Sequence, residues 1–195
     1  MLDSYLIANG LSVTEGYSQQ VPGQVRDLIT LTSAPGLRVM EIGFNAGHSA
    51  EVFLSNNPTM KLTSFDLGVH EYLKTGKEYI DFTFPGRHEL VLGDSKTTVP
   101  VFPDAKFDVI FIDGGHDYET ALADLLNCKR FASPETIVMM DDTMFREDWV
   151  AGWCVGPTTV WKEYRENGTL IELGSQDYSP GRGMSWGRYA FQSLE

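Results

Sequence analysis

Residues 38–49, RVMEIGFNAGHS, contain a short apolar run that ends in an acid and gives way to a turn with two glycines. Val39 and Ile42 are typical of a buried strand, and the turn is expected to lead into a helix. Gly43 and Gly47 carry no Cβ atom, so the backbone between them can turn sharply and lie close to a bound molecule. The stretch therefore predicts a first strand, a ligand-binding turn and a helix.

The spacing within this turn bears on the ligand it takes. The pattern E-x-G-x-x-x-G starts at Glu41 and places Asn45 where the dinucleotide-binding pattern G-x-G-x-x-G has its middle glycine, close to a pyrophosphate. This argues against an NAD(P)-dependent Rossmann oxidoreductase, which is the first alternative function. A second interpretation of the turn is structural, with glycines that only allow tight packing.

The composition is that of one globular domain. The chain has 195 residues, of which 42% are hydrophobic, and a formal net charge of -12 without any run rich in Lys or Arg. These properties argue against nucleic acid or an anionic membrane as a partner and favour small molecules. The first ten residues lack a basic signal-peptide region, and no segment approaches the roughly 20 apolar residues of a membrane span, so we expect a soluble, cytoplasmic protein. Cys128 and Cys154 have neither metal-binding nor redox spacing and are expected to be reduced packing residues.

Strand and helix patterns alternate along the chain. Besides the first strand, strands are expected at 61–66, 88–92, 107–113, 136–141, 170–173 and 185–191. Helices are expected at 22–33, from 47 to about 56, at 69–84, from 118 onwards and at 158–166. The first five strands imply a parallel sheet with helices on both faces, and the last two an antiparallel hairpin joined by the loop DYSPGRG.

The expected fold is therefore α/β, with a doubly wound, Rossmann-like, seven-stranded and mostly parallel sheet that ends in a C-terminal antiparallel hairpin. We expect a single domain over residues 1–195. Residues 1–36 form its N-terminal loop and helix, residues 37–143 its cofactor-binding half, and residues 144–195 its substrate-side loop, helix and antiparallel strands.

The second strand ends in Asp66, which lies 25 positions beyond Glu41. Nucleotide-binding βαβ folds place at this point a carboxylate that accepts hydrogen bonds from ribose hydroxyls. Asp66 is therefore the first candidate for a cofactor contact, although a carboxylate there can also cap the next helix.

Acids also follow the fourth and fifth strands, which we expect to be neighbours. Asp113 ends the run FDVIFID, and Asp141 ends TIVMMD and is followed directly by Asp142. Carboxylates brought together repel one another unless a cation or a shared proton compensates, and a site made of oxygens alone suits Mg²⁺, Mn²⁺ or Ca²⁺. Together these acids predict a divalent metal site; singly, each is a helix cap or a surface group.

The motifs EIGFNAGHS, the strand ending at Asp66, GDS at 93–95, FDVIFIDGGHDYE and MMDDT occur in the order found in class I S-adenosylmethionine-dependent methyltransferases. The last two most closely resemble the metal-dependent small-molecule O-methyltransferases, the group that includes catechol and caffeoyl-coenzyme A enzymes and a branch that acts on antibiotic sugars and cephamycins. The resemblance covers nearly the whole chain. It implies S-adenosylmethionine as cofactor and a hydroxyl of a small molecule as methyl acceptor. The chain also lacks the N/D-P-P-Y/F motif of enzymes that methylate amino groups.

The resemblance also assigns residues. Metal ligands fall on Asp113, Asp141 and Asp142, although the sugar and cephamycin branch often has Glu where Asp141 stands. The base of the sugar branch falls on His116, whose structural alternative is to cap the helix near residue 118. The remaining cofactor contacts fall on the first glycine turn, on the adenine-side turn and on the acid after the fourth strand: Glu41, Gly43, Asn45, Gly47, Ser49, Asp94, Ser95 and Asp113.

Three questions stay open at this level. Residues 14–20 are either a surface loop or, as in the related enzymes, a lid over the cofactor with contacts from Glu15 and Tyr17. The segment around Trp149 and Trp153 either borders the substrate or packs in the core. A catalytically silent S-adenosylmethionine-binding domain is the second alternative function, and a homo-oligomer is possible.

Overall fold

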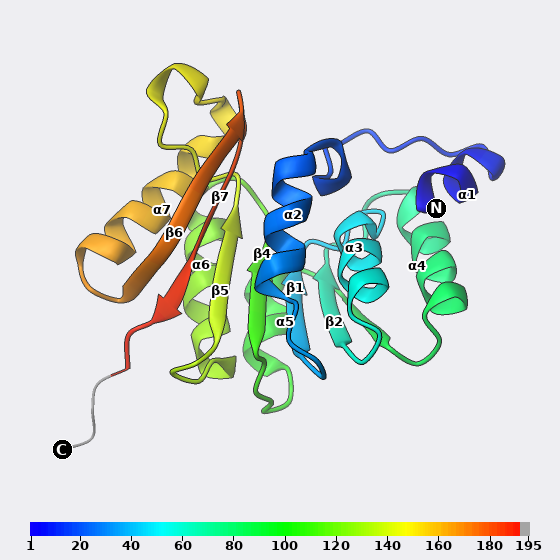
Figure 1. The fold of residues 1–195 in the computed structure, drawn as a ribbon, viewed down its shortest axis with the longest axis horizontal. Helices are drawn as coiled ribbons and strands as arrows, with labels where there is room; N and C mark the ends of the chain where they lie inside the picture. Colours follow the sequence, from blue (N-terminus) through cyan, green and yellow to red (C-terminus); the bar gives the residue numbers. More distant parts are fainter. Residues whose placement is uncertain (192–195) are drawn as a thin grey trace.

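Figure 1 shows the computed structural model of the chain, in which residues 1–191 are described. Its strands are β1 (Arg38–Ile42), β2 (Lys61–Asp66), β3 (His88–Leu92), β4 (Val109–Ile112), β5 (Ile137–Asp141), β6 (Leu170–Ser179) and β7 (Arg182–Tyr189). Its α-helices are α1 (Leu2–Ala8), α2 (Pro22–Leu31), α3 (His48–Asn56), α4 (Tyr72–Thr83), α5 (Ser95–Val101), α6 (Tyr118–Cys128) and α7 (Val155–Glu166). Short 3-10 turns are η1 (Ser18–Gln20), η2 (Lys129–Phe131), η3 (Glu147–Trp149) and η4 (Gly152–Cys154). The last four residues of the expected domain, 192–195, lie outside the described residues.

The strands form one sheet in the order β3-β2-β1-β4-β5-β7-β6. Neighbouring strands from β3 to β5 are parallel, whereas β7 runs antiparallel to both β5 and β6. The predicted α/β fold with a seven-stranded, mostly parallel sheet and a C-terminal hairpin is therefore confirmed. The strand order reverses between β1 and β4, and open α/β sheets bind their ligands beside such a reversal, at the carboxyl ends of the strands. These ends lie at the upper edge of the sheet in Figure 1.

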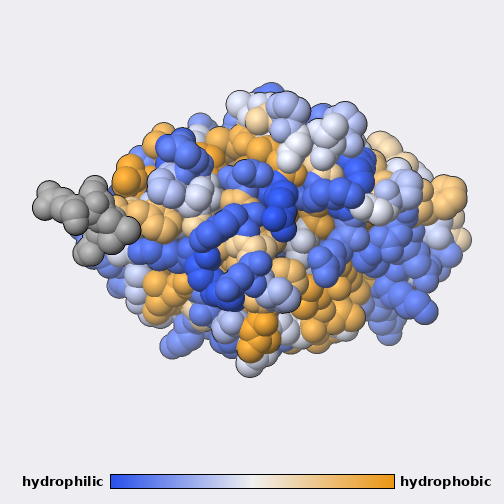
Figure 2. Space-filling view, turned by 90° about the horizontal axis from the view of Figure 1, so that it is seen from below, coloured by the Kyte–Doolittle hydropathy of each residue, from blue (hydrophilic) through white to orange (hydrophobic). Residues whose placement is uncertain are grey.

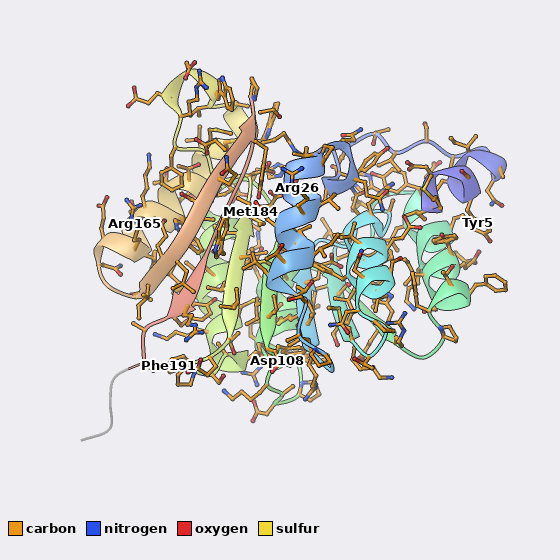
Figure 3. The ribbon with its side chains drawn as sticks, in the orientation of Figure 1. Tyr5, Arg26, Asp108, Arg165, Met184 and Phe191 are labelled. Carbon is orange, nitrogen blue, oxygen red and sulfur yellow. The ribbon has the colours of Figure 1, made fainter. Side chains whose placement is uncertain are left out.

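Helices cover both faces of the sheet, because alternate residues of each central strand point to opposite sides. Val39 belongs to a core cluster shared with α2, α3 and α4, and its neighbour Met40 belongs to a second cluster shared with α5, α6 and α7. In Figure 1, α2 and α3 lie in front of the sheet and α5 and α6 behind it. Met184 of β7 packs into the cluster on the α2 side (Figure 3). Apolar side chains thus fix the sheet from both faces.

Two helices were not expected from the sequence. Helix α5 contains Pro100 and four β-branched residues, which are poor helix formers, but Asp94 caps it by accepting a hydrogen bond from the Lys96 N–H at 2.9 Å. Helix α1 is short, and it is held in place because Leu2 and Leu6 on one of its faces are buried. A cap therefore stabilises α5 and a tertiary contact stabilises α1, and local propensity does not account for either helix.

The C-terminal hairpin is longer than expected. The sequence predicted strands at 170–173 and 185–191 and a loop between them over 177–183. That prediction of the loop was wrong, since only Pro180 and Gly181 lie between β6 and β7. Glycines of the hairpin allow close packing: a Cβ atom at Gly174 would lie 2.5 Å from the Trp186 ring, and one at Gly183, within the predicted loop, would overlap the Thr143 carbonyl oxygen.

The opposite edge of the sheet, where the parallel strands begin, faces the viewer in Figure 2. It is largely hydrophilic, with hydrophobic side chains in separate patches. Within residues 1–191, no helix has both the length and the apolar character needed to cross a membrane.

At the strand reversal, the backbones of β1 and β4 come into contact. Gly43, directly after β1, has φ +96°, and a Cβ atom on it would overlap the carbonyl oxygen of Asp113, directly after β4. The sequence predicted that the backbone at Gly43 lies close to a bound molecule. The close neighbour in the structure is the backbone at Asp113, and the contact with a bound molecule stays a prediction.

We predict that Gly43→Ala destabilises the protein clearly more than Gly36→Ala. Gly36 also has a positive φ, +74°, but has no atom within 4 Å of an added Cβ, so its replacement adds backbone strain only. The overlap at Gly43 should add about 1 to 3 kcal/mol to that strain. Urea unfolding of the two variants measures the difference, and equal losses of unfolding free energy would contradict the close contact.

Candidate functional site

The glycine turn and the end of β2 form one hydrogen-bonded unit. The Asn45 N–H donates to Asp66 Oδ2 at 2.7 Å, and the Gly68 N–H donates to Asp66 Oδ1 at 2.8 Å. Asn45 itself has φ +53°, and its side-chain oxygen is buried without a hydrogen-bond partner among the described residues. Gly47, with φ +96°, precedes the first residue of α3. The structure therefore brings Gly43, Asn45, Gly47 and Asp66 together, and one buried acceptor in this turn is unsatisfied.

Glu41 lies beneath the turn and is fully buried. Ser49 and Ser64 both donate hydrogen bonds to its carboxylate, and His88 Nε2 lies 2.9 Å from the Ser64 hydroxyl. Burial raises the pKa of Glu41 to about 7 and lowers the pKa of His88 to about 3. Glu41 and Ser49 thus face the space between the sheet and α3, where they support the turn from below; their direct contact with a cofactor stays a prediction.

Asp94 and Ser95 lie at the start of α5, where Asp94 serves as the helix cap. Next to them, Asp124 on α6 is completely buried, and its burial raises its pKa to about 6, an effect that the Ser95 hydroxyl reduces. Sequence reasoning missed Asp124. Its signal is visible, because a charged residue stands at a helix position whose i−3, i+1 and i+4 neighbours, Ala121, Leu125 and Cys128, are apolar and buried.

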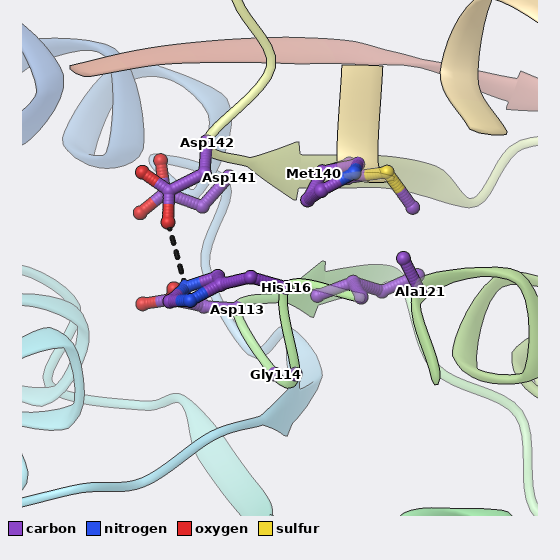
Figure 4. Close-up of a pocket in the computed structure, with 10 residues that line it drawn as sticks. Asp113, Gly114, His116, Ala121, Met140, Asp141 and Asp142 are labelled. Carbon is purple, nitrogen blue, oxygen red and sulfur yellow. Dashed lines mark ion pairs between the residues drawn. The ribbon is translucent and has the colours of Figure 1, made fainter. Parts of the chain in front are cut away.

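The three acids expected to bind a metal are gathered at the carboxyl ends of β4 and β5. One carboxylate oxygen each from Asp113, Asp141 and Asp142 lies within 4.8 Å of the others. Figure 4 shows the two loops that carry them facing each other across a cavity of about 10 Å³, roughly the space of one water molecule or ion. Burial, followed by repulsion from the other two acids, raises the pKa of Asp113 well above its usual value. Burial and Asp142 likewise raise the pKa of Asp141 to about 7.

His116 joins this cluster from the loop after β4. Its Nε2 atom lies 2.9 Å from Asp142 Oδ2, and its ring is half-exposed (Figure 4). The hydrogen bond with Asp142 raises the pKa of His116, although burial acts in the opposite direction. The helix that follows is capped by Asp117, whose carboxylate accepts a hydrogen bond from the Thr120 N–H, so capping does not require His116.

Two further polar residues reach the cluster, and sequence reasoning named neither. Gln24 on α2 is buried, and its Nε2 donates to Asp141 Oδ1 at 2.7 Å. Arg182, the first residue of β7, donates to Gln24 Oε1 at 3.4 Å. Its positive charge counteracts the rise in the pKa values of Asp113 and Asp141. Gln24 lies 117 positions before Asp141 in the sequence, and Arg182 lies on the last strand of the sheet. No motif that contains the acids therefore includes either residue.

The N-terminal segment passes over this end of the molecule. The Tyr17 ring stacks on His48 with 3.7 Å between centroids, and its hydroxyl donates to Asp3. Glu15 forms an ion pair with His70, with 3.2 Å between Oε1 and Nε2. In Figure 1 the segment runs from α1 to α2 above the carboxyl ends of the strands. Side-chain contacts of Glu15 and Tyr17, the two residues proposed for a lid, thus hold this segment in place.

The aromatic segment after β5 contains the 3-10 turns η3 and η4, and α7 begins at Val155, three residues before the predicted start. Trp153 is 49% exposed, and its Nε1 donates to the Gly181 carbonyl oxygen. Trp149 packs under the Arg146 guanidinium. Neither tryptophan belongs to a buried core cluster, which disfavours the core interpretation of this segment. Cys128 and Cys154 are free and buried, as expected.

Comparison with known proteins shows which family the chain belongs to. A family model described as a methyltransferase domain matches residues 40–143, from β1 to just past the paired acids. No curated protein sequence matches the chain significantly.

Solved structures of methyltransferases share the fold. An O-methyltransferase from Bacillus cereus, in complex with S-adenosylhomocysteine, is 17% identical with a TM-score of 0.72, over 97% of this chain and 89% of that chain. The S-adenosylhomocysteine-bound methyltransferase PaMTH1 of Podospora anserina is 15% identical with a TM-score of 0.66, over 86% and 78%. CalS11, a TDP-rhamnose 3'-O-methyltransferase of calicheamicin biosynthesis, is 21% identical with a TM-score of 0.61, over 87% and 81%.

The family model covers more than half of the chain and contains the glycine turn, Asp66 and all three clustered acids. The chain therefore belongs to the methyltransferase domain family, and it is a class I S-adenosylmethionine-dependent methyltransferase.

Proposed function

We propose that the protein transfers the methyl group of S-adenosylmethionine to a hydroxyl of a small molecule, with the help of a divalent cation. The observation that carries this proposal is the gathering of Asp113, Asp141 and Asp142 within 4.8 Å of one another, with His116 bonded to one of them. The acids lie beside the glycine turn, because Gly43 contacts the backbone of Asp113. A methyl donor at the turn and an acceptor at the acids would thus be neighbours.

The glycine turn supplies the cofactor site in this proposal. Asp66 has both oxygens aligned by backbone N–H groups, and each oxygen has a second lone pair with which to accept from a ribose hydroxyl. The unsatisfied Asn45 oxygen is a further acceptor for a polar group of the cofactor. Asp94 and Ser95 would bind the adenine from the adjacent turn.

The acid cluster fits a divalent cation. All its donors are oxygens, as Mg²⁺ or Mn²⁺ prefers, and Asp142 Oδ1 is buried without a partner among the described residues. Gln24 and His116 each engage an oxygen of one acid and so fix how Asp141 and Asp142 face the cavity. When bound, the cation would orient the acceptor hydroxyl and lower its pKa.

His116 would accept the proton. Its Nε2 is held by Asp142, so Nδ1 is the ring atom left to take the proton of the acceptor hydroxyl. As that O–H bond breaks, the oxygen forms a bond to the methyl carbon, and the electrons of the broken sulfur–carbon bond stay on sulfur, leaving S-adenosylhomocysteine. Asp142 would stabilise the imidazolium that forms.

We predict that Asp66→Ala weakens the binding of S-adenosylmethionine by about one to two orders of magnitude, because the ribose hydroxyls lose a charged acceptor. Isothermal titration calorimetry measures the change. Glu78→Ala removes an exposed acid from α4 and should leave the affinity unchanged. Unaltered affinity in Asp66→Ala, or equally tight binding of NAD by the wild type, would contradict the assignment.

Chelation tests the metal. Dialysis against EDTA should abolish methyl transfer and Mg²⁺ should restore it, since the clustered carboxylates need a cation to hold the acceptor. Asp142→Asn should raise the Mg²⁺ concentration required, whereas Asp148→Asn, on an exposed turn, should not. Full turnover of exhaustively chelated, metal-free protein would eliminate the cation from the proposal.

We predict that His116→Ala lowers kcat by about 10²- to 10⁴-fold while the affinity for S-adenosylmethionine and the Tm stay nearly unchanged. The reason is that His116 removes a proton and, with Asp117 capping α6, is not needed for folding. His70→Ala is the control for losing an imidazole elsewhere on the same edge. Retained kcat with a lowered Tm would instead assign His116 a structural role.

A further inference from the structure

Arg182 occupies a place that the proposed mechanism does not use. It opens β7 directly after the Pro180-Gly181 turn, and a single carboxamide, that of Gln24, separates its guanidinium from the acid cluster. The orientation of this carboxamide is fixed, since its nitrogen donates to Asp141 and its oxygen accepts from Arg182. The guanidinium therefore lies one side chain away from the proposed acceptor site.

Most of the hydrogen-bonding capacity of this guanidinium is unused. Among residues 1–191, one of its five N–H donors has a partner, through a long 3.4 Å hydrogen bond to Gln24. The Nε atom is buried and has no partner among residues 1–191. A part-buried cation with unpaired donors in a fixed fork is suited to a planar or tetrahedral oxyanion, which it can bind through two hydrogen bonds.

Arg182 is poorly placed to act as a counter-ion of the acids. No carboxylate of the described residues lies within ion-pair distance of it, whereas Arg130, Arg146 and Arg165 all form such pairs. A counter-ion would be expected to contact at least one of the three acids, given that they repel one another. Its charge acts to lower the pKa values of Asp113 and Asp141 without direct contact.

The N-terminal segment closes the space on the other side of the guanidinium. An added Cβ atom at Gly16 would lie 2.5 Å from Arg182 Nη1, so the segment lies directly against the side chain. The guanidinium is thus confined between residue 16, α2 and the hairpin, with the Gln24 side chain between it and the acids. Such confinement lowers the entropy lost when a ligand binds.

We propose that Arg182 binds an anionic group of the methyl acceptor, so that the acceptor class is a hydroxylated molecule bearing a carboxylate or a phosphate ester. The hydroxyl lies at the acid cluster and His116, and the oxyanion lies at Arg182. This inference rests on the proposed function and specifies the class of acceptor that the site selects. It also explains how a protein with a net charge of -12 can take an anionic substrate, because the attraction is local.

Two matched pairs of probes test this with the full-length protein, saturated with S-adenosylhomocysteine and Mg²⁺. The carboxylate pair is 3,4-dihydroxybenzoate and its neutral amide, and the phosphate pair is glucose 6-phosphate and glucose. In calorimetry, the anionic member of at least one pair should bind about tenfold or more tightly than the neutral member. The pair that shows the preference identifies the oxyanion.

Variants then locate the preference. Arg182→Gln should reduce the ratio of the two Kd values to about one, and Arg182→Lys should retain part of it, because a lysine keeps the charge but not the fork. Arg188→Gln removes the same charge from the other end of β7, where Arg188 pairs with Glu135, and should keep the full ratio. If Arg182→Gln does not fold, Gly16→Ala provides the test, because it displaces the guanidinium without removing it and should lower the ratio.

Two results would overturn the inference. One is equal affinity for both members of both pairs in the wild type, or no binding of either anionic probe up to its solubility limit. The other is an undiminished preference in folded Arg182→Gln. In either case Mg²⁺-dependent methyl transfer to a neutral diol would leave the proposed function intact. Absence of methyl transfer to neutral and anionic acceptors alike, with a retained anion preference in binding, would reject the function and keep the anion site.

Discussion

The contact between the backbones of β1 and β4 is the constraint on which the site depends. Gly43 and Asp113 follow two strands that are neighbours in the sheet but lie seventy positions apart in the chain. Because only a glycine fits against the Asp113 carbonyl oxygen, the turn proposed to bind the cofactor and the loop that carries the acids meet without an intervening side chain. Group transfer requires two reactants in direct apposition, and under the proposed function this contact would provide it before either reactant binds.

The acid cluster, in contrast to this backbone contact, is an arrangement that is unfavourable for folding. Burying Asp113, Asp141 and Asp142 together raises the pKa values of the first two, which is the expected response of carboxylates that repel one another in a poorly hydrated place. Gln24 and His116 compensate part of this repulsion with hydrogen bonds. Functional sites often retain such unfavourable groupings because the ligand completes them.

Sequence patterns predicted the sheet well, because the central strands are buried on both faces and their apolar runs are unmistakable. The bounds of β2 and β3 agree residue for residue, and the acids at the ends of β4 and β5 meet as expected. Patterns failed where a cap or a tertiary contact outweighs local propensity. Asp94 caps helix α5, whose residues are poor helix formers, and the hairpin extends through glycines that pack against Trp186 and Thr143.

The same limit applies to the site. Residues close to a recognisable motif were named, whereas Gln24, Asp124 and Arg182 were not. Gln24 and Asp124 lie on segments whose pattern predicts only a helix, and Arg182 lies in a segment predicted to be a loop. Glu41 illustrates the converse. Its motif predicts a cofactor contact, which stays a prediction, and the structure adds that Ser49 and Ser64 each donate to one of its oxygens, which no linear spacing reveals.

The outermost strand, β6, is ten residues long and pairs with β7 on one side only. Its register shifts twice, between Glu172 and Gly174 and between Asp177 and Ser179. Such bulges bend a strand and interrupt its row of free N–H and C=O groups, which otherwise serve as a template for strand addition. The irregular edge thus protects a long, partly apolar strand, with Ile171 and Leu173 exposed, from pairing in register with another chain and from the aggregation that follows.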